Sequence, residues 1–201
     1  MGQSTVTSIN LILEYIDKKN KTSINLISNI ENDLDNDHIV VDKLCYDLVK
    51  KYKLTNEQAR HIFAYMRCSS FLERIGDLSV KTINHLNRVL EFESDFDGKS
   101  ELTLLVRFIK NLINKSIISL VNKNEEMANE TIRDERENFK LKKNIIERCE
   151  VIMKEKSGYV PLSLEVIYSA NSVENIGRLC KQIAENAIYI VMKNDSKYFE
   201  D

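Results

Sequence analysis

Two segments of this chain place a glycine in the same four-residue frame. Glu73 to Asp77 reads ERIGD, and Glu174 to Arg178 reads ENIGR, 101 positions later (174 − 73). Each segment lies in a long stretch with no other glycine or proline. A glycine inside a helix costs about 1 kcal/mol relative to alanine, so its recurrence indicates a packing or binding constraint.

A second pair of residues supports an internal repeat. Cys45 and Cys149 lie 104 positions apart (149 − 45), and the same shift places the apolar Val41 on Ile145. The offsets of 101 and 104 differ by three residues (104 − 101), which a small difference in one loop accounts for. We therefore expect duplication of one three-helix unit.

The distribution of helix breakers favours helices throughout. The 201 residues include one proline and five glycines, and the apolar residues recur at helical spacing. Polar clusters and capping residues place breaks near residues 20, 54, 96, 123 and 159, with capping at Thr55-Asn-Glu-Gln58 and Asn124 and with Pro161 in the last helix's first turn. The sequence predicts an all-α fold of two tandem antiparallel three-helix bundles, residues 1–96 and 97–201.

Charge, hydropathy and cysteine spacing exclude several classes of protein. The net charge is −2 with both signs mixed, which gives no basic surface for nucleic acid. No run approaches the roughly 18 apolar residues that span a bilayer, so we expect a soluble protein without direct membrane insertion. The four cysteines, at 45, 68, 149 and 180, lack Cys-x-x-Cys spacing and are predicted to be free, buried thiols.

Two acidic pairs are the candidate binding residues. Glu31 and Asp35 are four apart on the second predicted helix, and Glu73 and Asp77 are four apart on the third, so each pair shares a helix face. If these helices pack antiparallel, the four carboxylates face one another and favour a hard cation: iron, manganese, magnesium or calcium. The alternative is a solvated acidic face, which is common in a chain with 31 acidic residues.

Histidine does little to extend this site. His38 follows Asp35 by three residues and could add a ligand, although a lone exposed histidine is more common. A di-metal carboxylate enzyme uses two Glu-x-x-His pairs, and this chain has none. An enzyme is therefore not expected.

The motif ERIGD, its weaker repeat ENIGR, the capping segment LTNEQA before the first motif and Pro161 before the second together resemble the PhoU family. The resemblance covers nearly the whole chain. It implies two tandem three-helix bundles whose Glu/Asp-x-x-x-Asp motifs bind multinuclear metal clusters. It also implies a cytoplasmic regulator that restrains phosphate uptake and phosphate-starvation signalling through a phosphate transporter and a sensor kinase.

The second repeat departs from the family's pattern. Arg178 stands where the motif has aspartate, and Phe139 follows Glu135 at the counterpart of Asp35. Lys81 and Gln182 replace the family's usual asparagine one turn after each motif, and Lys81 could form a helix salt bridge with Asp77. We expect metal binding by the first repeat and little or none by the second.

The first helix is predicted to be two or three turns shorter than the fourth, which leaves apolar faces of the first unit uncovered. A second subunit, in a homodimer, would cover them. Alternatively, the chain is a PhoU-like domain of a longer protein such as a sodium–phosphate cotransporter. A metal-free helical interaction domain also remains open, because the second motif is degenerate.

Overall fold

The computed structural model describes residues 1–92 and 99–191, and within these ranges every regular element is helical. The elements are α1 (Gly2–Lys18), α2 (Thr22–Lys51), α3 (Asn56–Phe92), α4 (Lys99–Val121), α5 (Glu125–Glu155), a 3₁₀ turn at Ser157–Tyr159 and α6 (Val160–Val191). The predicted all-α class is confirmed, as are the breaks near 20, 54, 123 and 159. The break near 96 and the boundary between residues 96 and 97 lie outside the described residues.

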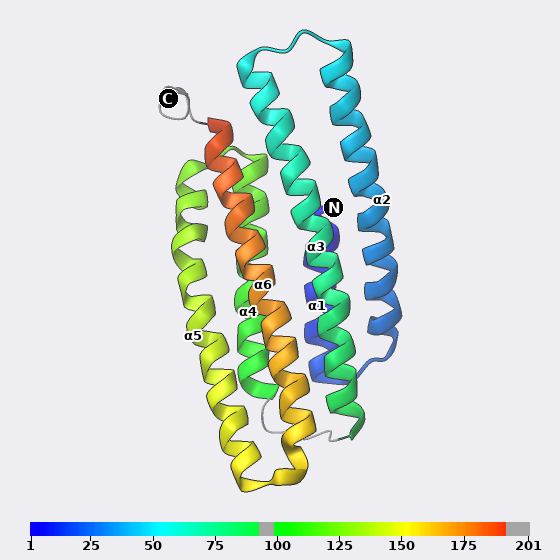
Figure 1. Cartoon of the computed structure of the whole chain (residues 1–201), viewed down its shortest axis with the longest axis vertical. Helices are drawn as coiled ribbons and strands as arrows, with labels where there is room; N and C mark the ends of the chain where they lie inside the picture. The colour runs from blue at the N-terminus through cyan, green and yellow to red at the C-terminus, as the bar shows by residue number, and fades with distance from the viewer. Residues whose placement is uncertain (93–98, 192–201) are drawn as a thin grey trace.

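The helices form two three-helix units that lie side by side (Figure 1). One unit contains α1, α2 and α3, and the other contains α4, α5 and α6. The most extensive contact between the units joins α3 to α6, which run in opposite directions, and α1 also packs on α4. Because the third helix of each unit lies at this junction, the two repeated glycine motifs meet near the centre of the molecule.

The predicted capping residues start their helices as expected. The Thr55 backbone N–H donates to Gln58 Oε1 at 3.0 Å, and the Gln58 backbone N–H donates to Thr55 Oγ1 at 3.2 Å, which is a reciprocal capping box. Asn124 Oδ1 accepts from the Met127 backbone N–H at 3.0 Å. Pro161 is the second residue of α6, in the first turn, where its missing N–H has no helical partner.

Both repeated glycines are sites of close helix packing. A Cβ on Gly76 of α3 would lie 2.8 Å from Leu34 Cδ1 of α2. A Cβ on Gly177 of α6 would overlap the Asn138 side chain of α5 and lie 2.8 Å from Ile109 Cδ1 of α4. The glycines therefore let neighbouring helices approach, which explains their recurrence.

One hydrophobic core runs through both units. It includes the fully buried Ile9, Ile75, Ile109 and Ile176, which come from four different helices. All four cysteines are buried and free, as predicted. Within the described ranges, no helix is long and apolar enough to cross a membrane.

Helix α1 is shorter than α4, but by less than predicted. It has 17 residues against 23, a difference of six residues (23 − 17) or about 1.7 turns, because α1 already begins at Gly2. The far end of α2 and the start of α3 still extend beyond it (Figure 1). Large apolar side chains are exposed there, and we name them the apolar hairpin end: Ile39, Val40, Leu44, Tyr46, Leu48, Val49, Tyr52, Phe63 and Tyr65.

Candidate functional site

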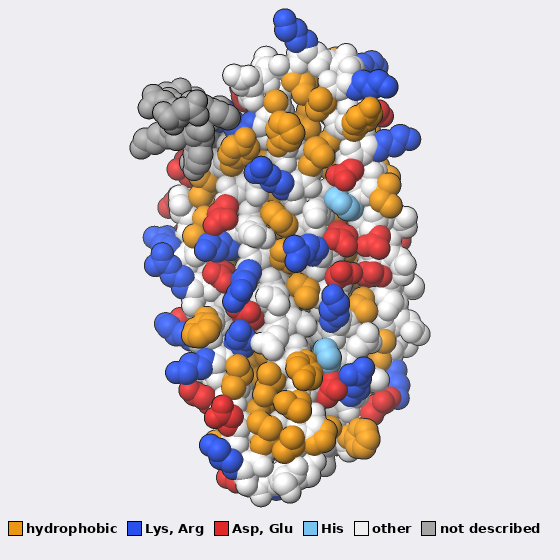
Figure 2. All heavy atoms as spheres, viewed as in Figure 1, with side chains coloured by type: hydrophobic (Ala, Val, Ile, Leu, Met, Phe, Trp, Pro, Cys, Tyr) orange, Lys and Arg blue, Asp and Glu red, His pale blue; other side chains and the backbone are white. Residues whose placement is uncertain are grey.

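The four predicted carboxylates lie where α2 packs against α3. Glu31 and Asp35 come from α2, and Glu73 and Asp77 come from α3. Acidic side chains gather over these two helices at mid-height in Figure 2. The close approach permitted by Gly76, whose added Cβ would lie 3.6 Å from Glu31 Cα, brings the two acidic pairs to one contact.

The electrostatics show that the two pairs interact. Burial raises the pKa of Glu31, and the charges of Asp35 and Asp77 raise it further. Burial also raises the pKa of Glu73, as do Asp77 and Asp35, while His38 and Arg74 oppose the rise. Each glutamate therefore senses the aspartate of the opposite helix, which is the arrangement expected for antiparallel packing.

One oxygen of this cluster has no hydrogen-bond partner. Asp35 Oδ1 is buried, and no described residue donates to it. A buried carboxylate oxygen without a donor is destabilising, and a bound cation would satisfy it. The donor set suits a hard cation, since all of its atoms are oxygens. Even so, no group of three or more His, Cys, Asp or Glu side chains in the described part of the chain is already placed to hold a metal ion.

His38 interacts with residues outside the four carboxylates. Its Nδ1 lies 3.0 Å from Ser69 Oγ, and its Nε2 lies 3.7 Å from Asp42 Oδ2. Both ring nitrogens thus have neighbours within the protein. This favours a structural role for His38 over a ligand role.

The equivalent position in the second repeat is an ion cluster. Glu174 is only 4% exposed. Its Oε1 accepts from Arg178 Nε at 2.8 Å and lies 2.7 Å from Arg178 Nη2, and its Oε2 lies 3.4 Å from Lys142 Nζ. Phe139 supplies no oxygen and is exposed. Two side-chain cations therefore balance the charge of Glu174.

Lys142 was not singled out from the sequence, although a signal for it was present. The shift of 104 that relates Cys45 to Cys149 also relates His38 to Lys142 (142 − 38) and Leu34 to Asn138 (138 − 34). In the structure, Asn138 Nδ2 donates to the Glu174 backbone carbonyl at 2.8 Å. Polar residues of α5 thus support Glu174 where apolar Leu34 packs in the first repeat.

A second ionic contact, which no sequence pattern indicates, joins α3 to α6. Glu165 Oε2 lies 2.6 Å from His85 Nδ1, and Glu165 Oε1 accepts from Arg88 Nη1 at 3.1 Å. Burial alone would raise the pKa of Glu165, but the hydrogen bonds from His85 and Arg88 lower it overall. The salt bridge suggested between Lys81 and Asp77 is absent from the described residues.

The sequence matches a known family over both halves. The model of the PhoU domain matches residues 1–85 and 102–187. A relative named phosphate-specific transport system accessory protein PhoU homolog 1, from Thermotoga maritima, is 23% identical over 197 residues, covering 96% of this chain and 83% of its own length. The accessory protein PhoU of Serratia marcescens is 25% identical over 170 residues, covering 80% of this chain and 65% of its own length.

Solved structures share the fold. PhoU from Pseudomonas aeruginosa superposes with a TM-score of 0.91 at 18% identity, covering 95% of this chain and 91% of that one. The phosphate transport system regulatory protein PhoU from Streptococcus pneumoniae gives a TM-score of 0.82 at 15% identity, covering 94% and 88%. The two matched segments, the repeated glycine motif and the paired three-helix units agree: this chain belongs to the PhoU family.

Proposed function

We propose that this chain is a cytoplasmic regulatory component of a phosphate-uptake system, acting by binding a phosphate transporter and a sensor kinase rather than by catalysis. The observation that carries the proposal is the family match across both repeats, to relatives that are named as accessory proteins of phosphate-specific transport. Long helices with exposed polar and apolar faces offer extended surfaces for such partners.

The test is deletion of the gene in its host, followed by measurement of phosphate uptake and of a phosphate-starvation reporter in phosphate-rich medium. We expect uptake and the reporter to rise, and an intact gene copy to restore both. Pull-down of the tagged chain should also recover transporter or kinase subunits. Unchanged uptake and an unchanged reporter in the deletion strain would contradict the regulatory role.

We further propose that the first repeat binds a carboxylate-held metal cluster through Glu31, Asp35, Glu73 and Asp77. The support is the partnerless Asp35 Oδ1 and the mutual raising of glutamate pKa values across α2 and α3. Four carboxylates repel one another when no cation is present. A hard cation such as iron, manganese, magnesium or calcium would reverse the sign of this interaction and draw them together.

Elemental analysis of protein purified without chelator tests this site. Asp77→Asn should lower bound metal strongly, whereas Glu174→Gln should leave it unchanged, because Glu174 is already balanced by Arg178 and Lys142. Equal losses from both changes would show that the two repeats bind together. Metal content unaffected by Asp77→Asn would mean that the acidic face is solvated surface.

A metal-free interaction domain is the second candidate. The observation in its favour is the Glu174 ion cluster, which shows that this fold can balance its motif glutamate with its own side chains. In that case the chain would still bind partners, and elemental analysis would find no metal above the level of the Asp77→Asn variant. The same measurement thus separates the two candidates.

We also propose that two copies associate through the apolar hairpin end. Leu44 is 57% exposed and Tyr46 is 64% exposed there, beyond the reach of α1. Figure 2 shows hydrophobic side chains gathered over the end of the molecule where α2 meets α3. Leu44→Lys should shift the sedimentation coefficient to that of a monomer. Leu104→Lys, at an equally exposed leucine of α4, is the matched control and should leave the dimer intact.

A further inference from the structure

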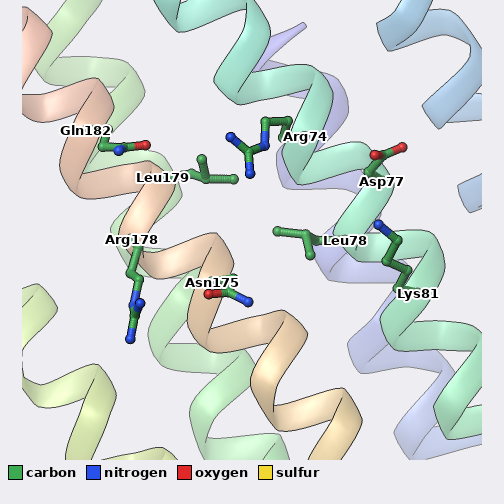
Figure 3. A pocket seen from close by; sticks show the side chains of 8 residues that line it. All are labelled: Arg74, Asp77, Leu78, Lys81, Asn175, Arg178, Leu179 and Gln182. Carbon is green, nitrogen blue, oxygen red and sulfur yellow. The ribbon is translucent and has the colours of Figure 1, made fainter.

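A polar groove lies between α3 and α6, apart from the carboxylates of Glu31, Asp35 and Glu73. Its volume is about 380 Å³. The α3 side is formed by Arg74, Asp77, Leu78 and Lys81 (Figure 3). This volume falls within the range of small-ligand sites in proteins.

The groove is lined by equivalent residues of the two repeats. Each of its four α3 residues has a counterpart 101 positions later that lines the α6 side (175 − 74, 178 − 77, 179 − 78 and 182 − 81). Since α3 and α6 run antiparallel, this pairing places the groove on the approximate two-fold axis that relates the repeats. A ligand here would contact both units at once.

The charge of the groove is positive and partly unbalanced. Arg74 and Lys81 are exposed, and neither forms an ion pair or hydrogen bond with any residue in the ranges 1–92 and 99–191. Arg74 points from α3 toward α6 in Figure 3. Arg178, on the other side, gives two of its donors to Glu174 and leaves the rest of its guanidinium available. Asp77 is the one carboxylate on the lining.

Neutral hydrogen-bond donors complete the lining. Asn175 and Gln182 replace Arg74 and Lys81 on the α6 side, and both are exposed. Side-chain amides donate to oxygen without adding charge. The groove therefore combines free cations on one wall with amide donors on the other, which is the complement of an oxygen-rich anion.

We propose that this groove binds a small phosphoryl oxyanion, such as inorganic phosphate or a pyrophosphate group, between the two repeats. Arg74 and Lys81 supply two positive charges against the one negative charge of Asp77, so the α3 wall has a net positive charge. A phosphoryl group offers these donors more oxygens than a carboxylate does. The volume of about 380 Å³ accommodates one or two linked phosphoryl groups with bridging water. The cations and amide donors of the groove are not ligands of the proposed metal cluster, although Asp77 belongs to both sites. The proposal does not depend on the proposed regulatory role.

The test is titration calorimetry of the full chain, stripped of metal and dialysed free of chelator, with inorganic phosphate and separately with sodium pyrophosphate. Removing metal first prevents an ion at the acidic cluster from bridging to the anion. The informative variant is Arg74→Gln with Lys81→Gln, because both side chains are exposed and unpaired and the fold does not depend on them. The control is Arg133→Gln with Lys154→Gln, two exposed cations of α5 outside the groove, which changes the net charge equally.

We expect saturable binding of at least one probe to the unmodified chain. Affinity should fall about tenfold or more in the Arg74→Gln, Lys81→Gln variant, as expected for lost charge-assisted hydrogen bonds, and should be unchanged in the control. Binding of pyrophosphate alone, or of both probes, supports the site equally. The proposal is overturned if neither probe binds at up to about 10 mM, or if the control variant loses as much affinity as the groove variant.

Discussion

Glu73 and Glu174 hold the same place in the two repeats but meet opposite surroundings. Glu73 lies among carboxylates, and its pKa is raised by burial and by Asp77. Glu174 lies against Arg178 and Lys142. The same position of the repeat therefore has acidic neighbours in the first unit and basic neighbours in the second.

Neutralising substitutions at these two sites should change the stability of the metal-free protein in opposite directions. Glu174→Gln leaves Lys142 and Arg178 without their anion and should lower the free energy of unfolding by about 1–2 kcal/mol. Asp77→Asn removes a repelling charge and should raise it by about 0.2–0.5 kcal/mol. Urea unfolding monitored by circular dichroism, in the presence of a chelator, measures both. A loss of stability in Asp77→Asn would show that this carboxylate is balanced within the chain.

The raised pKa values of Glu31 and Glu73 predict a pH dependence. A carboxyl group whose pKa is higher in the folded chain stabilises the fold below its unfolded value, near 4.5, and this contribution is lost as pH rises through the folded pKa. In metal-free protein at neutral pH, the double variant Glu31→Gln, Glu73→Gln should therefore be more stable than the unmodified chain. The difference should shrink as the pH falls toward 4.5. A difference that stays constant with pH would contradict the coupling.

At the scale of the helices, the two packing glycines differ in what surrounds them. An added Cβ at Gly76 meets the end of the Leu34 side chain, which can move, and alanine gains about 1 kcal/mol in helix propensity. An added Cβ at Gly177 meets both Asn138, which is hydrogen-bonded to the Glu174 backbone, and Ile109. Gly177→Ala should thus lower the free energy of unfolding by about 1–3 kcal/mol, and Gly76→Ala by much less.

Gly158→Ala is the control for this comparison, because no atom lies within 4 Å of its added Cβ. Its free energy of unfolding should stay within about 0.5 kcal/mol of the original. Thermal or urea unfolding of the three variants measures the order. Equal losses at Gly76 and Gly177 would show that the flexible Leu34 side chain cannot move aside.

The helix boundaries could be predicted because they depend on local chemistry. The Thr55 and Asn124 caps act within their own first turns, so their hydrogen bonds follow from three or four neighbouring residues. The acidic contact between α2 and α3 followed from helical spacing and antiparallel packing. The meeting of Glu165 with His85 and Arg88 could not be predicted, because it depends on how α3 and α6 align, 77 or more residues apart in the chain.

At the scale of the whole molecule, the shared core predicts that both repeats unfold together. Buried residues of α1, α3, α4 and α6 belong to one cluster, so neither unit keeps its core when the other opens. Calorimetry should show one transition whose calorimetric and van't Hoff enthalpies agree. Glu174→Gln, in the second repeat, should shift this transition as a whole. A split into two peaks would show that the units unfold separately.

The antiparallel contact of α3 with α6 also bears on how the two halves diverged. In a dimer of two identical first repeats related by a two-fold axis, Arg74 of each copy would lie across the groove from Lys81 of the other copy, so two cations would face each other at both ends of the groove. In this chain Arg74 lies across the groove from Gln182, and Lys81 lies across from Asn175, while Leu78 and Leu179 are alike (Figure 3). Duplication within one chain thus freed the two sides to differ. A single polypeptide can place an amide opposite each cation, where a symmetric ancestor would have placed two cations opposite each other.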